Sequence, residues 1–282
     1  MASSVQVFDS KAAGARRFEG KTAIVTGAGQ GHGRATARRL AQEGAALMLV
    51  DRHPAGAERT MDELTRFGSD ADTYVGDISS VEPFQEVAAK TVERFGKIDV
   101  LVNVAGGAMY GPKLGWEYTP KELMANVQNN LWTCMWGCYS VLPYMVDQGS
   151  GAIVNFGSHA VRGTHRLGYA AAKGGIYAIT TSLALETAQS GVRINCVVPH
   201  YSESEPGDRL VTRIPGQAAS QTTQSMQPRR ADLQARHLQN IPMGRAGTPQ
   251  ELAAAVAFLA SDDASFVTGD IMCVGGGAFC AL

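Results

Sequence analysis

Short apolar runs alternate with longer segments of helical periodicity along most of the chain. The apolar runs cover residues 21–26, 46–50, 73–77, 98–103, 151–157, 192–198 and 271–274. Between them, apolar residues recur at the spacing of one helix face, most clearly over residues 120–146 and 169–189. Strands that alternate with helices indicate βαβ units. The pattern therefore predicts an α/β fold with seven strands, and the lack of a linker favours a single domain.

The regular alternation is missing from two segments. Residues 1–18 are small, polar and aperiodic, and we expect a flexible N-terminal extension there. Residues 200–248 follow the sixth predicted strand and are polar, with several prolines. A segment of this length is either a lid over a site or disordered. Because it begins where open α/β sheets bind ligands, we expect a substrate lid within a domain of residues 19–282.

The composition narrows the classes of function. The 282 residues are 45% hydrophobic, enough for a sizeable core, and the formal charge of −1 comes from mixed acids and bases. Without a basic run, no nucleic-acid partner is expected. Apolar runs are too short for a membrane span or a signal peptide, so we expect no membrane partner and a cytoplasmic protein. The five scattered cysteines indicate neither a disulfide framework nor a metal site.

A glycine-rich turn follows the first strand and opens the first helix. Gly27, Gly31 and Gly33 are spaced as Gly-x-x-x-Gly-x-Gly. Such glycines let the backbone approach a pyrophosphate, whose charge meets free amides at the positive end of the helix. A plain turn is the alternative, but Asp51 at the end of the second strand supports nucleotide binding. Its carboxylate would bind the adenosine ribose and repel a 2′-phosphate, which favours NAD, although Arg52 weakens that inference.

Two further strand ends offer candidate cofactor contacts. Asp77 ends the third strand, where it would contact adenine or cap the helix that starts near Val81. Asn103 ends the fourth strand and is followed by small residues over 104–108. Small residues suit a place where the backbone lies against a flat cofactor ring, and a simple loop is the alternative.

The candidate catalytic residues lie at and after the end of the fifth strand. Tyr169 and Lys173 are about one helical turn apart, so the phenol and the ammonium share a helix face. A tyrosine is a poor base at neutral pH unless a neighbouring positive charge favours the phenolate, and Lys173 would supply that charge. The alternative for this pair is a packed ring beside a solvated charge. Ser158 lies at the carboxyl end of the fifth strand, the edge where such sheets bind ligands.

Asn130 interrupts the helix predicted over residues 120–146. Asparagine is a weak helix former, so a buried asparagine there needs a reason, such as holding a water or a backbone group.

These residues together resemble the motifs of the short-chain dehydrogenases/reductases. The matching positions are residues 26–33, 103–106 and 274–277, with Asn130, Ser158, Tyr169 and Lys173, and the likeness spans residues 19–277. It implies an oxidoreductase with a doubly wound, parallel, Rossmann-type sheet, assembled as a homotetramer. It also implies that Tyr169 is the acid/base and that Ser158 orients the substrate oxygen. Lys173 would bind the nicotinamide ribose, and Asn130 would hold a proton-relay water.

The sequence departs from the family pattern near this site. The interval from Ser158 to Tyr169 is shorter than usual, Val104 replaces a second asparagine, and His200 replaces the glycine that usually follows Pro199. The full set of expected NAD contacts is Gly27, Gln30, Gly31, His32, Gly33, Asp51, Arg52, Asp77, Ile78, Asn103, Ala105, Gly106, Tyr169, Lys173, Pro199 and Ser202.

Within the family, residues 103–108 and 160–166 resemble the benzoate cis-diol dehydrogenases. The resemblance implies a carboxylated cyclohexadiene diol as substrate, oxidised to a catechol with loss of carbon dioxide. Gly107, Arg162, His165 and Arg166 are the expected substrate contacts, because a carboxylate needs a cationic partner. A surface or interface charge cluster is the alternative for the basic residues. The rival functions are an enzyme of the same family for an uncharged alcohol, ketone or dihydrodiol, and a non-catalytic NAD-sensing protein.

Overall fold

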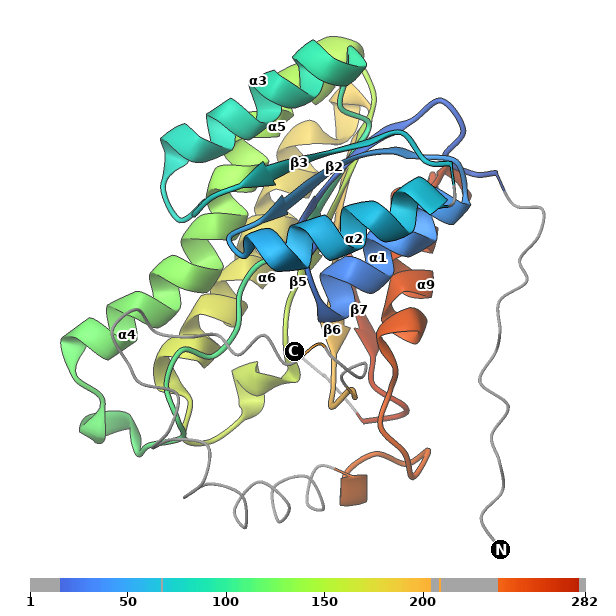
Figure 1. The fold of residues 1–282 in the computed structure, drawn as a ribbon. Coiled ribbons are helices and arrows are strands. Elements are labelled where there is room, and N and C mark those ends of the chain that lie inside the picture. Colours follow the sequence, from blue (N-terminus) through green and yellow to red (C-terminus); the bar gives the residue numbers. More distant parts are fainter. Residues whose placement is uncertain (1–15, 67, 204–207, 209–237, 279–282) are drawn as a thin grey trace, which may run out of the picture.

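The computed structural model describes residues 16–66, 68–203, 208 and 238–278. Within them, seven strands form one parallel sheet in the order β3-β2-β1-β4-β5-β6-β7 (Figure 1). The strands are β1 Thr22–Thr26, β2 Ala46–Asp51, β3 Ala71–Val75, β4 Val100–Asn103, β5 Gly151–Phe156, β6 Val192–Pro199 and β7 Ile271–Val274. The predicted single α/β domain with seven parallel strands is confirmed.

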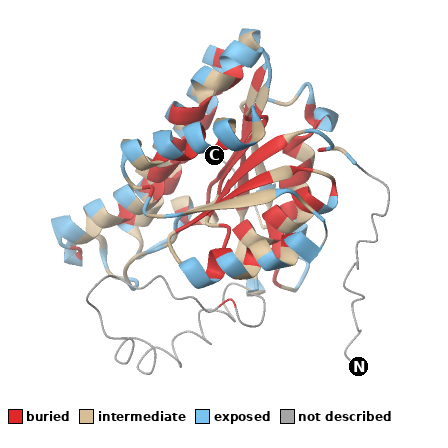
Figure 2. Ribbon diagram, turned by 45° about the horizontal axis from the view of Figure 1, so that its top comes forward, coloured by how far each residue is buried: buried red, intermediate tan, exposed pale blue. Residues whose placement is uncertain are grey.

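Helices cover both faces of the sheet (Figure 1). They are α1 Gly31–Gln42, α2 Pro54–Arg66, α3 Val81–Phe95, α4 Pro120–Val127, α5 Thr133–Gln148, α6 Leu167–Thr187 and α9 Pro249–Ala260. Successive strand residues point to opposite faces. Ala23 and Val25 of β1 therefore pack with α1 and α9, whereas Ile24 packs with α3, α5 and α6. Buried residues concentrate in the strands and on the inner sides of the helices (Figure 2).

The order of the strands creates a switch point at the edge of the sheet that holds the candidate site. From β1 the chain adds β2 and β3 on one side, then crosses to place β4 on the other side of β1. The loops after β1 and β4 consequently diverge, and ligands of open α/β sheets bind at such a switch point. The carboxyl ends of β1, β2, β4, β5 and β6 all open at this edge.

Two predicted elements differ from those in the structure. The third strand runs from Ala71 to Val75 instead of over residues 73–77. It is a half-buried edge strand, so its apolar pattern is weak, and pairing with β2 determines its position. The helix predicted over residues 120–146 is divided by a π-helical turn, Gln128–Trp132, that contains Asn130.

The two segments expected to be irregular lie largely outside the described residues. Residues 1–15 of the expected N-terminal extension are not described, but Phe18 is buried and its backbone donates to the Glu43 carbonyl. The folded part therefore begins before residue 19. Most of the expected substrate lid, residues 204–207 and 209–237, also lies outside the described part of the chain.

Candidate active site

Ser158 is held at the end of β5 by its backbone. Its carbonyl accepts a hydrogen bond of 2.7 Å from the Tyr177 hydroxyl, and its N–H lies 3.3 Å from the same oxygen. The Ser158 side chain caps a short 3₁₀ turn, His159–Arg162, by accepting from the Ala160 N–H at 3.1 Å. A Cβ at Gly157 would lie 2.3 Å from the Tyr177 ring, so glycine is required beside this ring. Tyr177 lies one turn after Lys173 on α6, but no sequence motif indicates it.

Lys173 and Tyr169 share a face of α6, as their spacing predicts. The Lys173 ammonium is buried, donates to the Phe156 carbonyl at 2.7 Å and lies 5.8 Å from the centre of the Tyr169 ring. The carbonyl at the end of β5 thus fixes the ammonium near the phenol. A buried charge in this position acts strongly on neighbouring groups because little solvent screens it.

Asn130 is fully buried and clamps the loop after β4. Its Oδ1 accepts from the Gly107 N–H at 2.8 Å, and its amide donates to the Gly107 carbonyl at 3.0 Å and the Asn126 carbonyl at 2.9 Å. A Cβ at Gly106 would lie 2.5 Å from Oδ1, so glycine allows the loop to approach. The side chain therefore holds a backbone group, one of the two roles expected for a buried asparagine at this position.

The glycine turn after β1 is packed too closely for side chains. A Cβ at Gly33 would lie 2.0 Å from the Gly27 carbonyl oxygen, and Gly27 has φ 64°. The Thr26 hydroxyl accepts from the Val104 and Ala105 N–H groups at 3.0 Å each, so it joins this turn to the loop after β4. The bare backbone at the start of α1 fits the close approach of a dinucleotide diphosphate.

Asp51 ends β2 beside this turn. Its Oδ2 accepts from the Gly29 N–H and its Oδ1 from the His53 N–H, both at 2.8 Å. Each carboxylate oxygen has a second lone pair with which to bind ribose hydroxyls. A Cβ at Gly29 would lie 2.9 Å from Oδ2, so Gly29 belongs to this arrangement, although the sequence analysis did not include it. Arg52 extends toward Asn129, whose Oδ1 is 3.4 Å away.

His32 is held between β5 and the segment after β6. Its Nε2 is 2.7 Å from the Ser202 hydroxyl, and its ring stacks on Phe156. Burial, with a smaller contribution from the charge of Lys173, lowers the pKa of His32 to about 4. The imidazole is therefore neutral at pH 7. His32 and Ser202, both expected cofactor contacts, are in direct contact with each other.

Five more residues were expected to contact the cofactor, and they lie in different surroundings: Asp77, Ile78, Asn103, Gln30 and Pro199. Asp77 is exposed and accepts from the Ser79 N–H at 2.9 Å, whereas Ser80 precedes α3, so the capping alternative for Asp77 is wrong. Ile78 is buried in the core. The Asn103 side chain is buried and donates to Asn155 Oδ1 at 2.9 Å. Gln30 directly precedes α1, and Pro199 ends β6.

The three basic residues expected to bind substrate lie on the loop before α6. Arg162 and His165 are exposed, and Arg166 directly precedes the helix. The His165 carbonyl accepts from the Tyr118 hydroxyl at 2.9 Å and the Lys113 N–H at 3.2 Å, and His165 has φ 63°. These contacts anchor the loop through the backbone of His165.

A pair of histidines that the motifs did not assign lies beside Ser158. The His159 and His200 rings are 4.1 Å apart between centroids, and His159 Nδ1 is 3.4 Å from the Pro199 carbonyl. His200 stands where the family pattern has glycine, so its ring fills space that is open in the pattern. The pair adds two imidazoles next to Ser158 at the carboxyl end of the sheet.

The part of the chain that the structure describes shows neither a metal site nor a membrane-spanning helix. Its histidine, cysteine and acidic residues form no group of three or more that could bind a metal ion. In the same residues, no helix is long and apolar enough to cross a membrane.

Comparisons with known proteins agree with the fold and the motifs. A family model described as enoyl-(acyl carrier protein) reductase matches residues 27–278. The 1,6-dihydroxycyclohexa-2,4-diene-1-carboxylate dehydrogenase of Pseudomonas putida is 39% identical over 93% of this chain and 94% of its own. The 2,3-dihydroxy-2,3-dihydro-p-cumate dehydrogenase of Pseudomonas putida is 36% identical over 93% and 95%.

The solved structures include an NAD⁺-bound xylitol dehydrogenase that superposes with a TM-score of 0.80. It is 32% identical, and the match covers 93% of this chain and all of the other. The family model and these relatives cover nearly the whole described domain, with the glycine turn and the Ser158, Tyr169 and Lys173 positions within the matched region. The chain therefore belongs to the short-chain dehydrogenases/reductases and is an oxidoreductase of that family.

Proposed function

We propose that the protein is a cytoplasmic, NAD-dependent dehydrogenase of a cis-dihydrodiol carboxylate. The substrate is 1,6-dihydroxycyclohexa-2,4-diene-1-carboxylate or a close analogue, and the products are a catechol and carbon dioxide. The observation that carries the proposal is the placement of Ser158, Tyr169 and Lys173 at the switch-point edge, beside the glycine turn. The similarity to two cis-dihydrodiol dehydrogenases supports the class of substrate.

The residues of the turn fit NAD. Gly27, Gly31 and Gly33 have no side chains of their own to keep a diphosphate from the backbone, and Asp51 presents a carboxylate where the adenosine ribose would lie. A carboxylate there repels a 2′-phosphate, which supports NAD over NADP. When bound, NAD supplies the hydride acceptor.

The chain's own residues handle the proton of the substrate hydroxyl. Ser158 orients the hydroxyl on the carbon next to the carboxylate-bearing carbon, and the Tyr169 oxygen takes its proton as that carbon loses hydride. The buried ammonium of Lys173, fixed by the Phe156 carbonyl, stabilises negative charge on the Tyr169 oxygen. Asn130 keeps the Gly107 backbone in place beside the substrate ring.

The product of this step is a β-keto acid. Its carbon–carbon bond to the carboxylate breaks, carbon dioxide leaves, and the electron pair remains on the ring as an enolate. Tyr169 returns the proton to the enolate oxygen, and the ring becomes aromatic as the catechol. One hydride leaves the substrate and no net proton is consumed or released when the substrate is the carboxylate anion.

The cationic loop supports a carboxylated substrate. Arg162, His165 and Arg166 precede the helix that carries Tyr169, and a guanidinium binds a carboxylate through paired hydrogen bonds. The exposure of Arg162 and His165 favours a second candidate, a dehydrogenase of uncharged dihydrodiols, in which these residues remain solvated.

The decisive experiment is to incubate the purified protein with NAD and the benzoate cis-diol. The proposal expects NADH, catechol and carbon dioxide in equal amounts. The matched control is an uncharged cis-dihydrodiol of the same ring. Turnover of the uncharged diol alone would support the second candidate, and turnover of neither diol would contradict the proposed substrate class.

We further propose a homotetramer in a reducing compartment. Tyr139 on α5 and Leu185 on α6 are 59% and 84% exposed, apolar surface that a neighbouring subunit would cover. The cysteines at positions 134, 138, 196 and 273 are free thiols, as expected in the cytoplasm. Light scattering of the purified protein would give its mass directly, and a monomer would contradict the assembly.

A further inference from the structure

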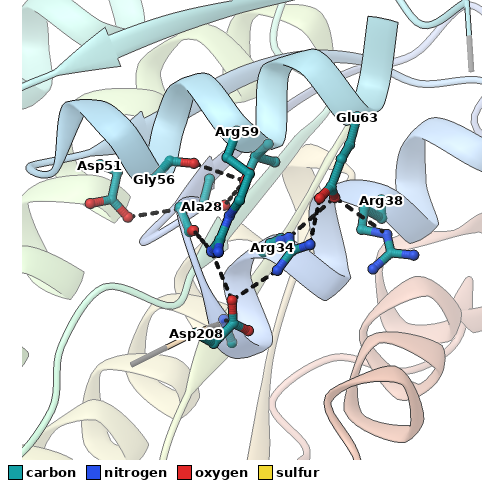
Figure 3. A network of polar contacts seen from close by, with 11 residues as sticks. Ala28, Arg34, Arg38, Asp51, Gly56, Arg59, Glu63 and Asp208 are labelled. Carbon is teal, nitrogen blue, oxygen red and sulfur yellow. Dashed lines mark hydrogen bonds and ion pairs between the residues drawn. The ribbon is translucent and has the colours of Figure 1, made fainter. Parts of the chain in front are cut away.

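A buried carboxylate lies on the glycine turn. Asp208 comes from the segment after β6, and only 1% of its side chain is exposed. Its Oδ2 accepts from the Gly31 N–H at 2.9 Å, and its Oδ1 accepts from Arg34 at 2.8 Å and from Arg59 at 2.7 Å (Figure 3). Three donors from the turn, α1 and α2 thus converge on one anion.

The donors of this group belong to the expected dinucleotide site. Gly31 is the first residue of α1, and its N–H has no partner within the helix, so it is available to an anion. Arg59 also donates to the Gly29 carbonyl at 2.9 Å, which places its guanidinium against the turn that Asp51 contacts from the other end (Figure 3). Asp208 therefore binds where the proposed site needs positive charge for a diphosphate.

Two anions cannot share these donors. A diphosphate beside the buried Asp208 carboxylate would experience like-charge repulsion with little screening, and the Gly31 N–H has one hydrogen to donate. We infer that Asp208 is an intramolecular competitor of the cofactor: its carboxylate occupies the diphosphate position in the free enzyme and leaves when a dinucleotide binds. The inference rests on the proposed dinucleotide site and is independent of the substrate.

The surrounding contacts make this exchange feasible. Arg34 also pairs with Glu63, which Arg38 approaches at 3.7 Å (Figure 3). Arg59 keeps the Gly29 carbonyl. Neither guanidinium is left without a partner when Asp208 departs, and both then face the incoming diphosphate. Release of Asp208 therefore exchanges one anion for another at a site that stays cationic.

The variant that tests the inference is Asp208→Asn, which keeps the shape and removes the charge. Isothermal titration with ADP-ribose, which carries the diphosphate, should give a Kd about tenfold lower than wild type, equivalent to about 1.4 kcal/mol. Adenosine, which lacks the diphosphate, should bind both proteins equally. The matched control is Asp263→Asn, which removes a half-exposed carboxylate paired with Arg17 and should change neither Kd.

An unchanged or higher Kd of the variant for ADP-ribose would overturn the inference, because Asp208 would then be a fixed structural partner or a clasp over the cofactor. If neither wild type nor variant binds NAD or ADP-ribose, the proposed function fails as well. If wild type binds both ligands and the variant binds no better, only the inference fails.

A measurement on the wild-type protein avoids any folding defect of the variant. Carbodiimide with an added amine labels accessible carboxylates, and peptide mass spectrometry locates the label. Asp208 should be protected in the free enzyme and become labelled when ADP-ribose saturates the site. Equal or lower labelling in the complex would contradict the inference, and Asp263 serves as the carboxylate accessible in both states.

Discussion

The Tyr177 hydroxyl donates a hydrogen bond of 2.7 Å to the backbone carbonyl of Ser158. The same oxygen lies 3.3 Å from the Ser158 N–H, so one side chain of α6 holds both polar groups of the residue that orients the substrate. Because α6 also carries Tyr169 and Lys173, this contact fixes the distance between Ser158 and the proposed acid/base. Tyr177 is therefore a positioning residue.

Replacing Tyr177 by phenylalanine tests this role. The change removes the hydroxyl that bonds the buried backbone carbonyl and N–H of Ser158, and it leaves the carbonyl only the longer contact of 3.4 Å with the Val161 N–H. We therefore expect a loss of about 1–3 kcal/mol in the free energy of unfolding. We also expect kcat to fall about tenfold, while the Kd for NAD stays within twofold, since a displacement of catalytic groups lowers the rate more than it weakens cofactor binding. A proportional loss of NAD affinity would indicate a general structural role instead.

The sheet could be predicted because parallel strands are buried on both faces and form continuous apolar runs, as in β4 and β5. The half-buried β3 lacks such a run, and its position was predicted two residues too late. The π-helical turn contains Asn130, which bonds the backbone of Gly107 in the loop after β4, and no local pattern indicates that contact. Both features depend on contacts between segments that are separate in the sequence, which a local pattern does not show.

The same distinction applies to the candidate site. Motif spacing led to the glycine turn, Asp51 and Tyr169, all of which are carried by local segments of strand and helix. Asp208 could not be found in this way, because its segment has no motif and its partner Gly31 is 177 residues away in the sequence. The bond from the Asn103 side chain to Asn155 inside the core could not be predicted from the motif either, and cofactor contact by Asn103 stays a prediction.

Replacing Tyr169 by phenylalanine should separate chemistry from binding. The phenol oxygen is lost while the ring that packs near Lys173 remains, so we expect kcat to fall by a factor of about 10²–10⁴, the usual contribution of an acid/base group. Thermal stability and the Kd for NAD should stay near the wild-type values. Tyr74→Phe, on the edge strand β3, where the hydroxyl bonds Glu86 at an exposed position, is the matched control. Retention of more than half the wild-type kcat by Tyr169→Phe would exclude tyrosine catalysis.

The lowered pKa of His32 predicts a pH-dependent stability. Burial and the charge of Lys173 lower this pKa to about 4 in the folded state, against about 6.5 in an unfolded chain. Between these values the unfolded state binds more protons, so the free energy of unfolding decreases as pH falls from about 6.5 toward about 4. The contribution of His32 is about 3 kcal/mol across that window.

Urea unfolding at pH 7 and pH 4.5 would measure this effect. His32→Gln, which retains an amide to bond the Ser202 hydroxyl, should lose less stability than wild type between the two pH values. His165→Gln, at an exposed position, serves as the control and should behave like wild type. Equal losses in wild type and His32→Gln would show that His32 does not cause the acid sensitivity.

Asp51→Asn should relax the preference for NAD. The amide keeps the shape of the side chain and an oxygen for one of the two backbone N–H groups, but it no longer repels a 2′-phosphate. We expect the KM for NADP to fall at least tenfold and the KM for NAD to rise, because the neutral group binds ribose hydroxyls less well. Steady-state kinetics with NAD and NADP would measure these changes. An unchanged ratio of the kcat/KM values for the two cofactors would assign the discrimination to another residue.

Arg162 and Arg166 should distinguish the carboxylated substrate from an uncharged one. If either guanidinium binds the carboxylate, its replacement by alanine removes a charge-assisted interaction worth about 1.5–3 kcal/mol, which raises KM by about ten- to a hundredfold. The effect should fall on KM, because the carboxylate is bound equally in the ground state and during hydride transfer. Each variant should retain wild-type kcat/KM toward an uncharged cis-dihydrodiol, so the ratio of the two substrates isolates the charge. An equal loss on both substrates would mean that the arginines only shape the loop before α6, and the neighbouring imidazoles of His159 and His200 would then be the next groups to replace.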